Sequence, residues 1–240
     1  DDPLFRYLLR LADDQLILGH RLSEWCGFAP VLEEELALAN IALDLIGQAR
    51  ALYAYAGTVE GRGRDEDQFA YWRDAADFTN ILMVERPNGD FAATIARLFL
   101  YSAYLELFWD AMRASADPTL AALAATARKE VAYHRRHSAE WLIRLGDGMA
   151  ESHRRAPDGI DAIWPDTGEL FAVDAVLRDL IARNIATDPT RFRAAWRQSV
   201  AAVLGDATLA CPRDADAGTN GRNGRHSEHL AALLAEMQVL

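Results

Sequence analysis

The chain has 240 residues, of which 51% are hydrophobic and 25% charged, and its formal net charge at pH 7 is −11. This length allows one large domain or two small ones around a sizeable core. The negative charge argues against nucleic acid as a partner, because phosphate contacts require basic stripes on the surface.

Neither a membrane span nor a secretory leader is indicated by the sequence. No apolar run reaches the roughly 18 residues of a membrane span, and no basic leader precedes an apolar segment at the N-terminus. The cysteines, Cys26 and Cys211, lack the spacing of a metal site, although a disulfide is an alternative. We therefore expect a reduced, cytoplasmic protein with no membrane partner.

Apolar periodicity predicts helices throughout the first half of the chain. A first helix is expected over residues 3 to about 25, and a second over residues 30 to about 56, with Gly57 as its stop. A long polar connection over residues 57–89 follows, interrupted by a short helix near residues 65–73.

Two further long helices complete the predicted bundle. They are expected over residues 90–114 and 118–145. The long link between the second and third helices is what a ferritin-like bundle requires, because that link crosses the bundle from end to end. We therefore predict an all-α, ferritin-like four-helix bundle, up-down-up-down with one long crossover.

The second half of the chain adds shorter helices and one polar loop. The helices are expected near residues 149–163, 173–186, 189–205 and 226–237, and the loop runs from residue 211 to 225. We treat residues 1–240 as a single ferritin-like domain, with its core bundle over about 3–147 and a helical extension over about 148–240.

Polar residues interrupt the apolar helices at regular positions. Asn40, Asp44 and Gln48 follow one another at intervals of four residues, so they form a line along one face of the second helix. Buried polar groups without partners each cost a few kcal/mol. This line is therefore expected to meet polar groups of another helix, or a metal.

Each of the four long helices offers one carboxylate where a dimetal site would need it. The four are Asp13, Asp44, Glu106 and Glu130. His134 lies one turn after Glu130, on the same face of the fourth helix.

The histidines that such a metal site requires are absent. Di-iron bundles use two Glu-x-x-His pairs, whereas Gly47 and Tyr133 stand three residues after Asp44 and Glu130. Three interpretations stay open: a polar core network that replaces the metals, a degenerate site of Glu130, His134 and Asp44, or a working di-iron centre. We favour the network, assigned to Asp13, Asp44, Gln48, Glu106, Glu130 and His134, and assign no catalytic residue and no metal ligand.

A second histidine pair, His226 and His229, lies near the end of the chain. Its spacing places both rings on one helical face and would suit zinc, but no third ligand is evident nearby. Because His226 stands where a helix starts, a capping or partner-contact role is favoured.

Several longer motifs resemble one known family, the C subunits of ring-1,2-phenylacetyl-CoA epoxidase in the ferritin-like superfamily. The motifs are Leu18–Gly27, Leu36–Arg50, Arg86–Phe91, Lys129–Trp141, Arg144–Gly148, His229–Leu230 and Leu234–Gln238. The resemblance extends from residue 4 to the C-terminus.

The resemblance implies a role in a multicomponent monooxygenase of aerobic phenylacetate catabolism. In that family a catalytic subunit holds the di-iron centre and epoxidises the ring with O2, and a reductase supplies electrons from NADPH through flavin and iron–sulfur groups. The family to which this chain is similar pairs with the catalytic subunit, stabilises it and holds no cofactor of its own. Other epoxidase subunits and the reductase are further implied partners. A homodimer of the chain alone, and an autonomous metal-binding oxidoreductase with a degenerate carboxylate and histidine site, are the alternatives.

Overall fold

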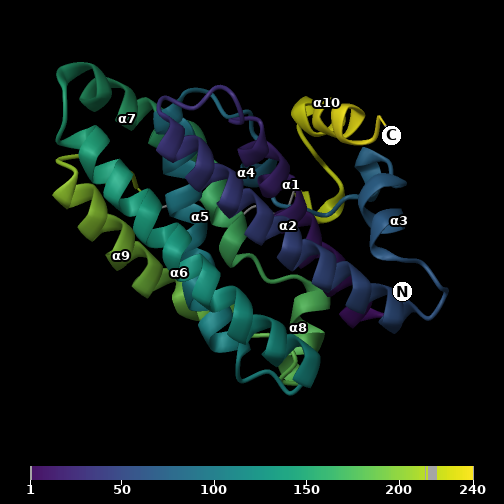
Figure 1. The fold of residues 1–240 in the computed structure, drawn as a ribbon. Coiled ribbons are helices and arrows are strands. Elements are labelled where there is room, and N and C mark those ends of the chain that lie inside the picture. Colours follow the sequence, from purple (N-terminus) through teal and green to yellow (C-terminus); the bar gives the residue numbers. More distant parts are fainter. Residues whose placement is uncertain (1, 214, 216–220, 240) are drawn as a thin grey trace. The chain divides into compact units, whose positions relative to one another are not determined.

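The computed structural model describes residues 2–213, 215 and 221–239, and these residues form ten α-helices and four short 3-10 helices (Figure 1). No strand is found among them. The predicted all-α class is therefore confirmed. The four long helices and the long link between the second and third also occur in the predicted order.

The chain divides into two compact units, each built from separate segments. The first unit comprises Asp1–Pro87, Asp174–Arg183 and Thr219–Leu240, and the second comprises Asn88–Val173 and Asn184–Gly218. The helices of the predicted C-terminal extension are thus shared between the two units. The division into a core bundle and an extension stays a prediction.

The first unit is organised by two long antiparallel helices, α1 (Pro3–Ser23) and α2 (Leu32–Glu60). The Asp2 side chain caps α1 by accepting a hydrogen bond from the backbone N–H of Leu4 at 2.8 Å. The helices approach closely at Gly19, where a Cβ atom would lie 2.8 Å from Ile46 Cγ1. Glycine at this position therefore lets the two backbones pack tightly.

Shorter elements complete the first unit. They are α3 (Glu66–Tyr71), η1 (Ala75–Asp77), α4 (Leu82–Glu85), α8 (Ala175–Ala182), η4 (Gly221–Asn223) and α10 (Glu228–Met237). A capping box between Asp65 and Gln68 starts α3, as the sequence pattern there favours.

The second unit is organised by α5 (Phe91–Met112) and α6 (Pro118–Gly146), which also run antiparallel. The Ser102 and Ser138 hydroxyl oxygens lie 3.4 Å apart, and the rings of Phe91 and Trp141 meet edge to face at 5.2 Å. The remaining elements are α7 (Ala150–Ile163), η2 (Trp164–Phe171), η3 (Pro189–Phe192) and α9 (Arg193–Asp206).

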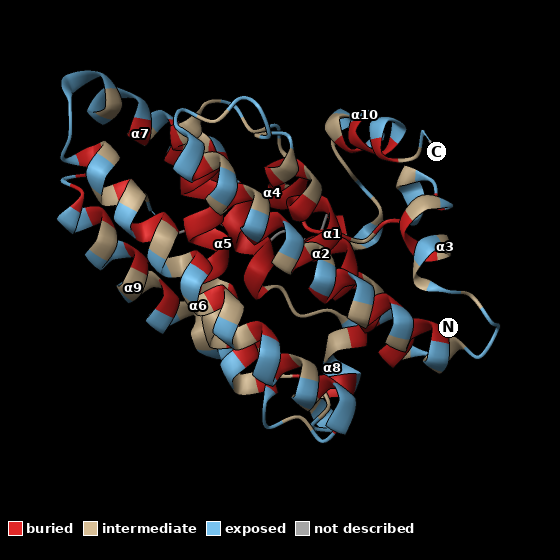
Figure 2. Cartoon of the chain, in the orientation of Figure 1, coloured by how far each residue is buried: buried red, intermediate tan, exposed pale blue. Residues whose placement is uncertain are grey.

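Helix α5 is the one described helix that is long and apolar enough to cross a membrane, and 72% of its apolar window is buried inside the protein. Burial of this extent is what the core helix of a globular protein shows. Figure 2 shows buried residues along most of its length.

The predicted stop of the second helix is wrong. Helix α2 continues past Gly57 to Glu60 and ends at Gly61, whose φ of 69° is left-handed. Gly57 is instead a packing position, because a Cβ atom there would lie 2.3 Å from the carbonyl oxygen of Arg64. Helix α2 also begins at Leu32 rather than at residue 30.

Other differences concern short elements. The sequence pattern did not predict α4 or the 3-10 helices, which hold too few residues for a periodic signal. Within the predicted loop over 211–225, residues 221–223 form η4, whereas residues 214 and 216–220 lie outside the described part of the chain.

Gly159 of α7 provides a test of the packing in the second unit. A Cβ atom there would lie 2.8 Å from the Ala93 Cα atom and 2.9 Å from its nitrogen. We expect Gly159→Ala to lower the free energy of unfolding by about 1–3 kcal/mol through overpacking. Gly205→Ala is the matched control, because no described atom lies within 4 Å of its added Cβ. Urea unfolding should show the control as stable as the wild type or more so; equal stability of the two variants would contradict this packing.

Candidate functional site

The predicted network residues are divided between the two units. Asp13 lies on α1, and Asp44 and Gln48 lie on α2, all in the first unit. Glu106 on α5, with Glu130 and His134 on α6, belongs to the second unit.

Asp13 is fully buried and both of its carboxylate oxygens are engaged. Arg73 donates to both oxygens. The hydroxyl of Tyr53 donates to Oδ1 at 2.6 Å. Thr79 donates to Oδ2 from its backbone N–H at 2.8 Å and from its hydroxyl at 3.0 Å. Asp13 therefore lies in a polar network of the first unit, with a guanidinium as its counter-charge.

The polar line on α2 is not buried as a whole. Gln48 is buried and Asp44 is half-buried, but Asn40 is exposed to solvent. The expectation that all three residues lie on a core face is therefore wrong for Asn40. On this helix the apolar side chains of Leu36 and Leu43 are exposed instead.

In the second unit, Glu106 forms an ion pair with Arg135 across α5 and α6. Both side chains are half-buried. Glu130 is half-buried as well, whereas His134 is 1% exposed. The structure thus joins Glu106 to Arg135, which was not among the six predicted network residues.

Gly47 and Tyr133, which stand where a di-iron bundle would have its histidines, do not lie in the core of the protein. Gly47 is exposed, with no described atom within 4 Å of an added Cβ. Tyr133 is 39% exposed, and its ring stacks on His137 with the centroids 5.7 Å apart.

These residues do not fit a di-iron centre. The Asp13 carboxylate is already neutralised by Arg73, and the described residues include no group of three His, Cys, Asp or Glu side chains that could hold a metal ion. We therefore derive no chemistry through a metal in this chain. Whether the six predicted residues act as one network stays a prediction.

A second set of buried charges lies beside Asp13 and was not found in the sequence. Arg222 donates to both oxygens of Asp14, at 3.0 and 2.7 Å, and to the carbonyl oxygen of Thr79 at 2.9 Å. The backbone N–H of Ile81 donates to Asp14 at 2.9 Å. The C-terminal segment is thereby joined to α1 and to the segment before α4.

A third buried group centres on Glu85 at the end of α4. Its Oε2 atom lies 2.7 Å from His226 Nδ1 and accepts from the Asn80 amide at 2.8 Å. Its Oε1 atom accepts from the backbone N–H of Ser227 at 2.6 Å. His226 Nε2 lies 2.8 Å from the carbonyl oxygen of Phe78. Both imidazole nitrogens therefore face acceptors, and this geometry selects the doubly protonated ring.

The protonation equilibria follow this geometry. Burial by itself lowers the pKa of His226, but the hydrogen bonds to Glu85 and to the Phe78 carbonyl outweigh it and raise the pKa above 6.5. Burial likewise raises the pKa of Glu85, and the bonds from His226, Ser227 and Asn80 outweigh it and lower that pKa.

The predicted roles of the histidine pair can now be assigned in part. His226 does not cap α10; Ser227 is the N-cap residue, and it makes no side-chain capping bond. His226 has both ring nitrogens engaged within the first unit. The backbone carbonyl of His229 accepts a hydrogen bond from Arg21 at 3.1 Å.

One signal in the sequence could have located the second buried group. Asp13, Asp14 and Gln15 are consecutive on a helix, so they point in three directions and cannot share one solvated face. All three are buried. Their partners, such as Arg222, lie too far along the chain for spacing to reveal them.

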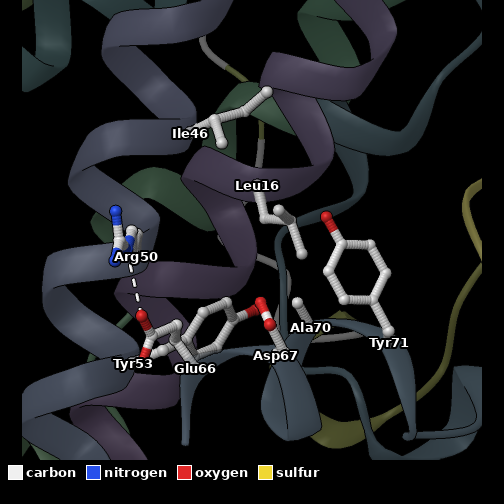
Figure 3. Close-up of a pocket in the computed structure, with 8 residues that line it drawn as sticks. All are labelled: Leu16, Ile46, Arg50, Tyr53, Glu66, Asp67, Ala70 and Tyr71. Atoms are coloured by element: carbon white, nitrogen blue, oxygen red, sulfur yellow. Dashed lines mark hydrogen bonds and ion pairs between the residues drawn. The ribbon is translucent and has the colours of Figure 1, made fainter.

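A cavity of about 340 Å³ lies among α1, α2 and α3 in the first unit (Figure 3). The ion pair between Arg50 Nε and Glu66 Oε1, 3.0 Å long, closes one side, and Tyr71 lies opposite. The full lining consists of Leu16, Ile46, Arg50, Tyr53, Glu66, Asp67, Ala70 and Tyr71. The lining thus combines apolar side chains with charged ones.

Comparison with known proteins matches the chain over residues 1–240 to the family described as phenylacetic acid catabolic protein. The chain belongs to this family. Among the curated members, the C subunit of 1,2-phenylacetyl-CoA epoxidase from Escherichia coli (strain K12) is 47% identical over 239 residues. That match covers 100% of this chain and 96% of the relative. The family resemblance seen in the motifs is therefore confirmed, together with the ferritin-like class of the fold.

The Asp13 and Arg73 pair can be tested by removing one charge. Asp13→Asn leaves a buried guanidinium without its counter-ion, so we expect a loss of about 3–5 kcal/mol in the free energy of unfolding. The control is Asp110→Asn, whose half-exposed carboxylate pairs with Arg113 and Arg128 and is expected to cost less than about 1 kcal/mol. Denaturant titration measures both. A similar small effect for the two variants would show that the buried pair does not hold the first unit together.

The His226 and Glu85 pair predicts a dependence of stability on pH. A histidine whose pKa is raised on folding contributes fully below pH 6.5 and loses this contribution as the pH rises through the folded-state pKa. The lowered pKa of Glu85 means that its own contribution is present above 4.5 and is lost as the pH falls. We expect the stabilisation by this pair to decline as the pH rises above 6.5, and His226→Gln to remove about 3 kcal/mol at pH 6 and to flatten the profile. Unfolding curves at several pH values test this, and an unchanged slope in the variant would refute it.

Proposed function

We propose that this chain is a non-catalytic, structural subunit of a multicomponent phenylacetyl-CoA epoxidase. In this proposal it pairs with a di-iron catalytic subunit and stabilises it. The proposal draws on the full-length similarity to a protein named as the C subunit of that enzyme. It includes no cofactor in this chain; di-iron belongs to the catalytic partner, and NADPH, flavin and iron–sulfur groups belong to a reductase.

The proposed non-catalytic role rests on one observation, which is that both oxygens of the Asp13 carboxylate already accept hydrogen bonds within the chain. A carboxylate that would serve a metal in a di-iron bundle accepts hydrogen bonds from Arg73, Tyr53 and Thr79 on both oxygens. A guanidinium and a divalent ion compete for the same negative charge. Arg73 is buried and provides a permanent positive charge beside Asp13. This supports a bundle that keeps its shape without iron.

The chain also offers the kind of stiffness that a supporting subunit needs. The buried charge pairs Asp13–Arg73, Asp14–Arg222 and Glu85–His226 join segments that are distant in the sequence. Since breaking a buried pair costs several kcal/mol, the joined segments open only at high cost. A rigid neighbour of this kind can hold a catalytic bundle in place while that bundle admits substrate.

The proposed location is the cytoplasm. Cys26 is exposed and Cys211 is half-buried. Two cysteines in 240 residues are not the disulfide-dense composition of a small secreted domain, which suits a reducing compartment. An NADPH-dependent reductase would be available to the complex in the same compartment.

Purified components test this function. We expect the chain alone, produced in iron-rich medium, to bind far less than one iron per chain and to oxidise no phenylacetyl-CoA. Together with the catalytic subunit and reductase it should raise the epoxidation rate, and it should raise the melting temperature of the catalytic subunit by several degrees. Iron analysis, product analysis and thermal melts measure these effects. Two tightly bound irons in this chain would support the autonomous oxidoreductase instead, and full activity of the catalytic subunit without this chain would overturn the structural role.

A further inference from the structure

Residues 221–239, the last described part of the chain, are attached to the first unit at two charged contacts. The first is Arg222 of η4, which binds both oxygens of Asp14. The second is His226, whose Nδ1 atom lies 2.7 Å from Glu85 Oε2. Arginine stays charged across the pH range in which proteins fold, whereas histidine changes its charge near neutral pH. The two contacts therefore differ in whether a change of pH can break them.

Helix α10 begins two residues after His226 and is short. Its ten residues, Glu228–Met237, are fewer than the roughly 12–15 that an isolated helix needs to persist in water. Its N-cap residue, Ser227, donates its backbone N–H to Glu85 Oε1 at 2.6 Å. The Glu85 carboxylate thus binds both the imidazole and the start of the helix. Loss of this contact would detach α10 at its first turn.

Beyond its first turn, α10 is held by apolar burial and by hydrogen bonds to neutral carbonyl groups. The carbonyl oxygen of His229 accepts from Arg21 at 3.1 Å, and the Gln238 amide donates to the carbonyl oxygen of Arg73 at 3.0 Å. Arginine, amide and carbonyl groups do not titrate near neutral pH, so these bonds do not respond to it. Figure 2 shows buried and exposed positions alternating along the helix. The buried side chains are Leu230, Leu233, Leu234 and Met237.

The imidazole of His226 faces a hydrogen-bond acceptor on each side. Nδ1 faces Glu85, and Nε2 lies 2.8 Å from the carbonyl oxygen of Phe78. A neutral ring has one N–H, so it would place a lone pair against one of these acceptors. The side chains of His226 and Glu85 are 6% and 0% exposed, so bulk water does not replace the lost hydrogen bond. Deprotonation therefore removes a hydrogen bond and a counter-charge in one step.

The charged groups around this ring come from other parts of the first unit. Glu85 on α4 is the nearest, and Asp13 on α1 adds a weaker attraction for the proton. Arg21, also on α1, donates to the backbone carbonyl oxygen of Glu85 at 2.9 and 3.1 Å. Arg73 is the cation that pairs with Asp13. Loss of the proton from His226 therefore leaves the Glu85 carboxylate with hydrogen bonds from neutral groups only.

We propose that His226 is a pH-dependent latch for the end of the chain. Loss of its proton favours local opening of residues 226–239, while Arg222 keeps the preceding residues in place. The segment opens and closes as a unit of its own, without the unfolding of α1 and α2. This inference rests on contacts within the chain and does not depend on the proposed function.

Hydrogen exchange of the full chain, followed by mass spectrometry between pH 6 and pH 9, tests the latch. One proton released per opening raises the population of the open segment by up to about tenfold per pH unit above 6.5. After correction for intrinsic exchange rates, peptides from α10 should lose protection with rising pH. They should also exchange faster than peptides from the middle of α1 at every pH, because the segment opens alone. Protection of α10 that is independent of pH would overturn the latch, and equal protection of α10 and α1 would overturn the local opening.

Two substitutions assign the effect to one histidine. His226→Gln removes the titrating group and keeps an amide donor near Glu85, so α10 should show the same protection at pH 6 and pH 9. His229→Gln is the matched control, because His229 contacts Arg21 through its backbone carbonyl, and its variant should keep the wild-type slope. A slope that persists in His226→Gln, or that disappears in His229→Gln, would overturn the assignment to His226. If His226→Gln does not fold, the wild type and the His229 variant decide by themselves.

Discussion

The buried guanidinium of Arg73 facing Asp13 is the constraint on which the first unit depends. Arg73 follows α3, Asp13 lies in the middle of α1, and Tyr53 from α2 contacts both. A buried charge must have a partner, so these segments can reach their packed positions only together. An intact pair of this kind adds little net stability compared with an apolar contact, but it penalises arrangements that separate its members.

The buried carboxylates of the first unit also have their counter-charges within the chain. In a metal-containing bundle the ion neutralises several carboxylates at once. In the first unit the buried carboxylates of Asp13, Asp14 and Glu85 instead have cations from the chain itself, which are Arg73, Arg222 and His226. The positive charges thus come from segments that are distant in sequence. They neutralise the buried carboxylates within the protein itself.

The sequence was sufficient to predict the helices but not to predict which residues pair with the buried charges on them. The four long helices have clear periodicity, proline or aspartate at their starts, and glycine or polar breaks after them. Gly57 misled the prediction because a glycine in a helix can mark either its end or a close approach, and only the position of Arg64 distinguishes the two. Asp13 was recognised as a buried position, but spacing cannot reveal that its partner is Arg73, and Arg222 is further still from Asp14. The polar line on α2 misled for a related reason: the apolar residues around Asn40 suggested that it is buried, although Asn40 itself and the nearby Leu36 and Leu43 are exposed.

The assembly of the first unit from separated segments has a consequence for biosynthesis. Arg222 and His226, which complete the pairing of Asp14 and Glu85, lie close to the C-terminus. A ribosome adds residues from the N-terminus onward, and compact units generally form as their residues emerge. Here α1 and α4 emerge long before their cations, so the carboxylates stay hydrated until residues 222 and 226 have been synthesised. The first unit is therefore completed only after residue 226 has been synthesised, and a chain terminated before residue 221 would carry two acidic groups, Asp14 and Glu85, without their buried counter-ions.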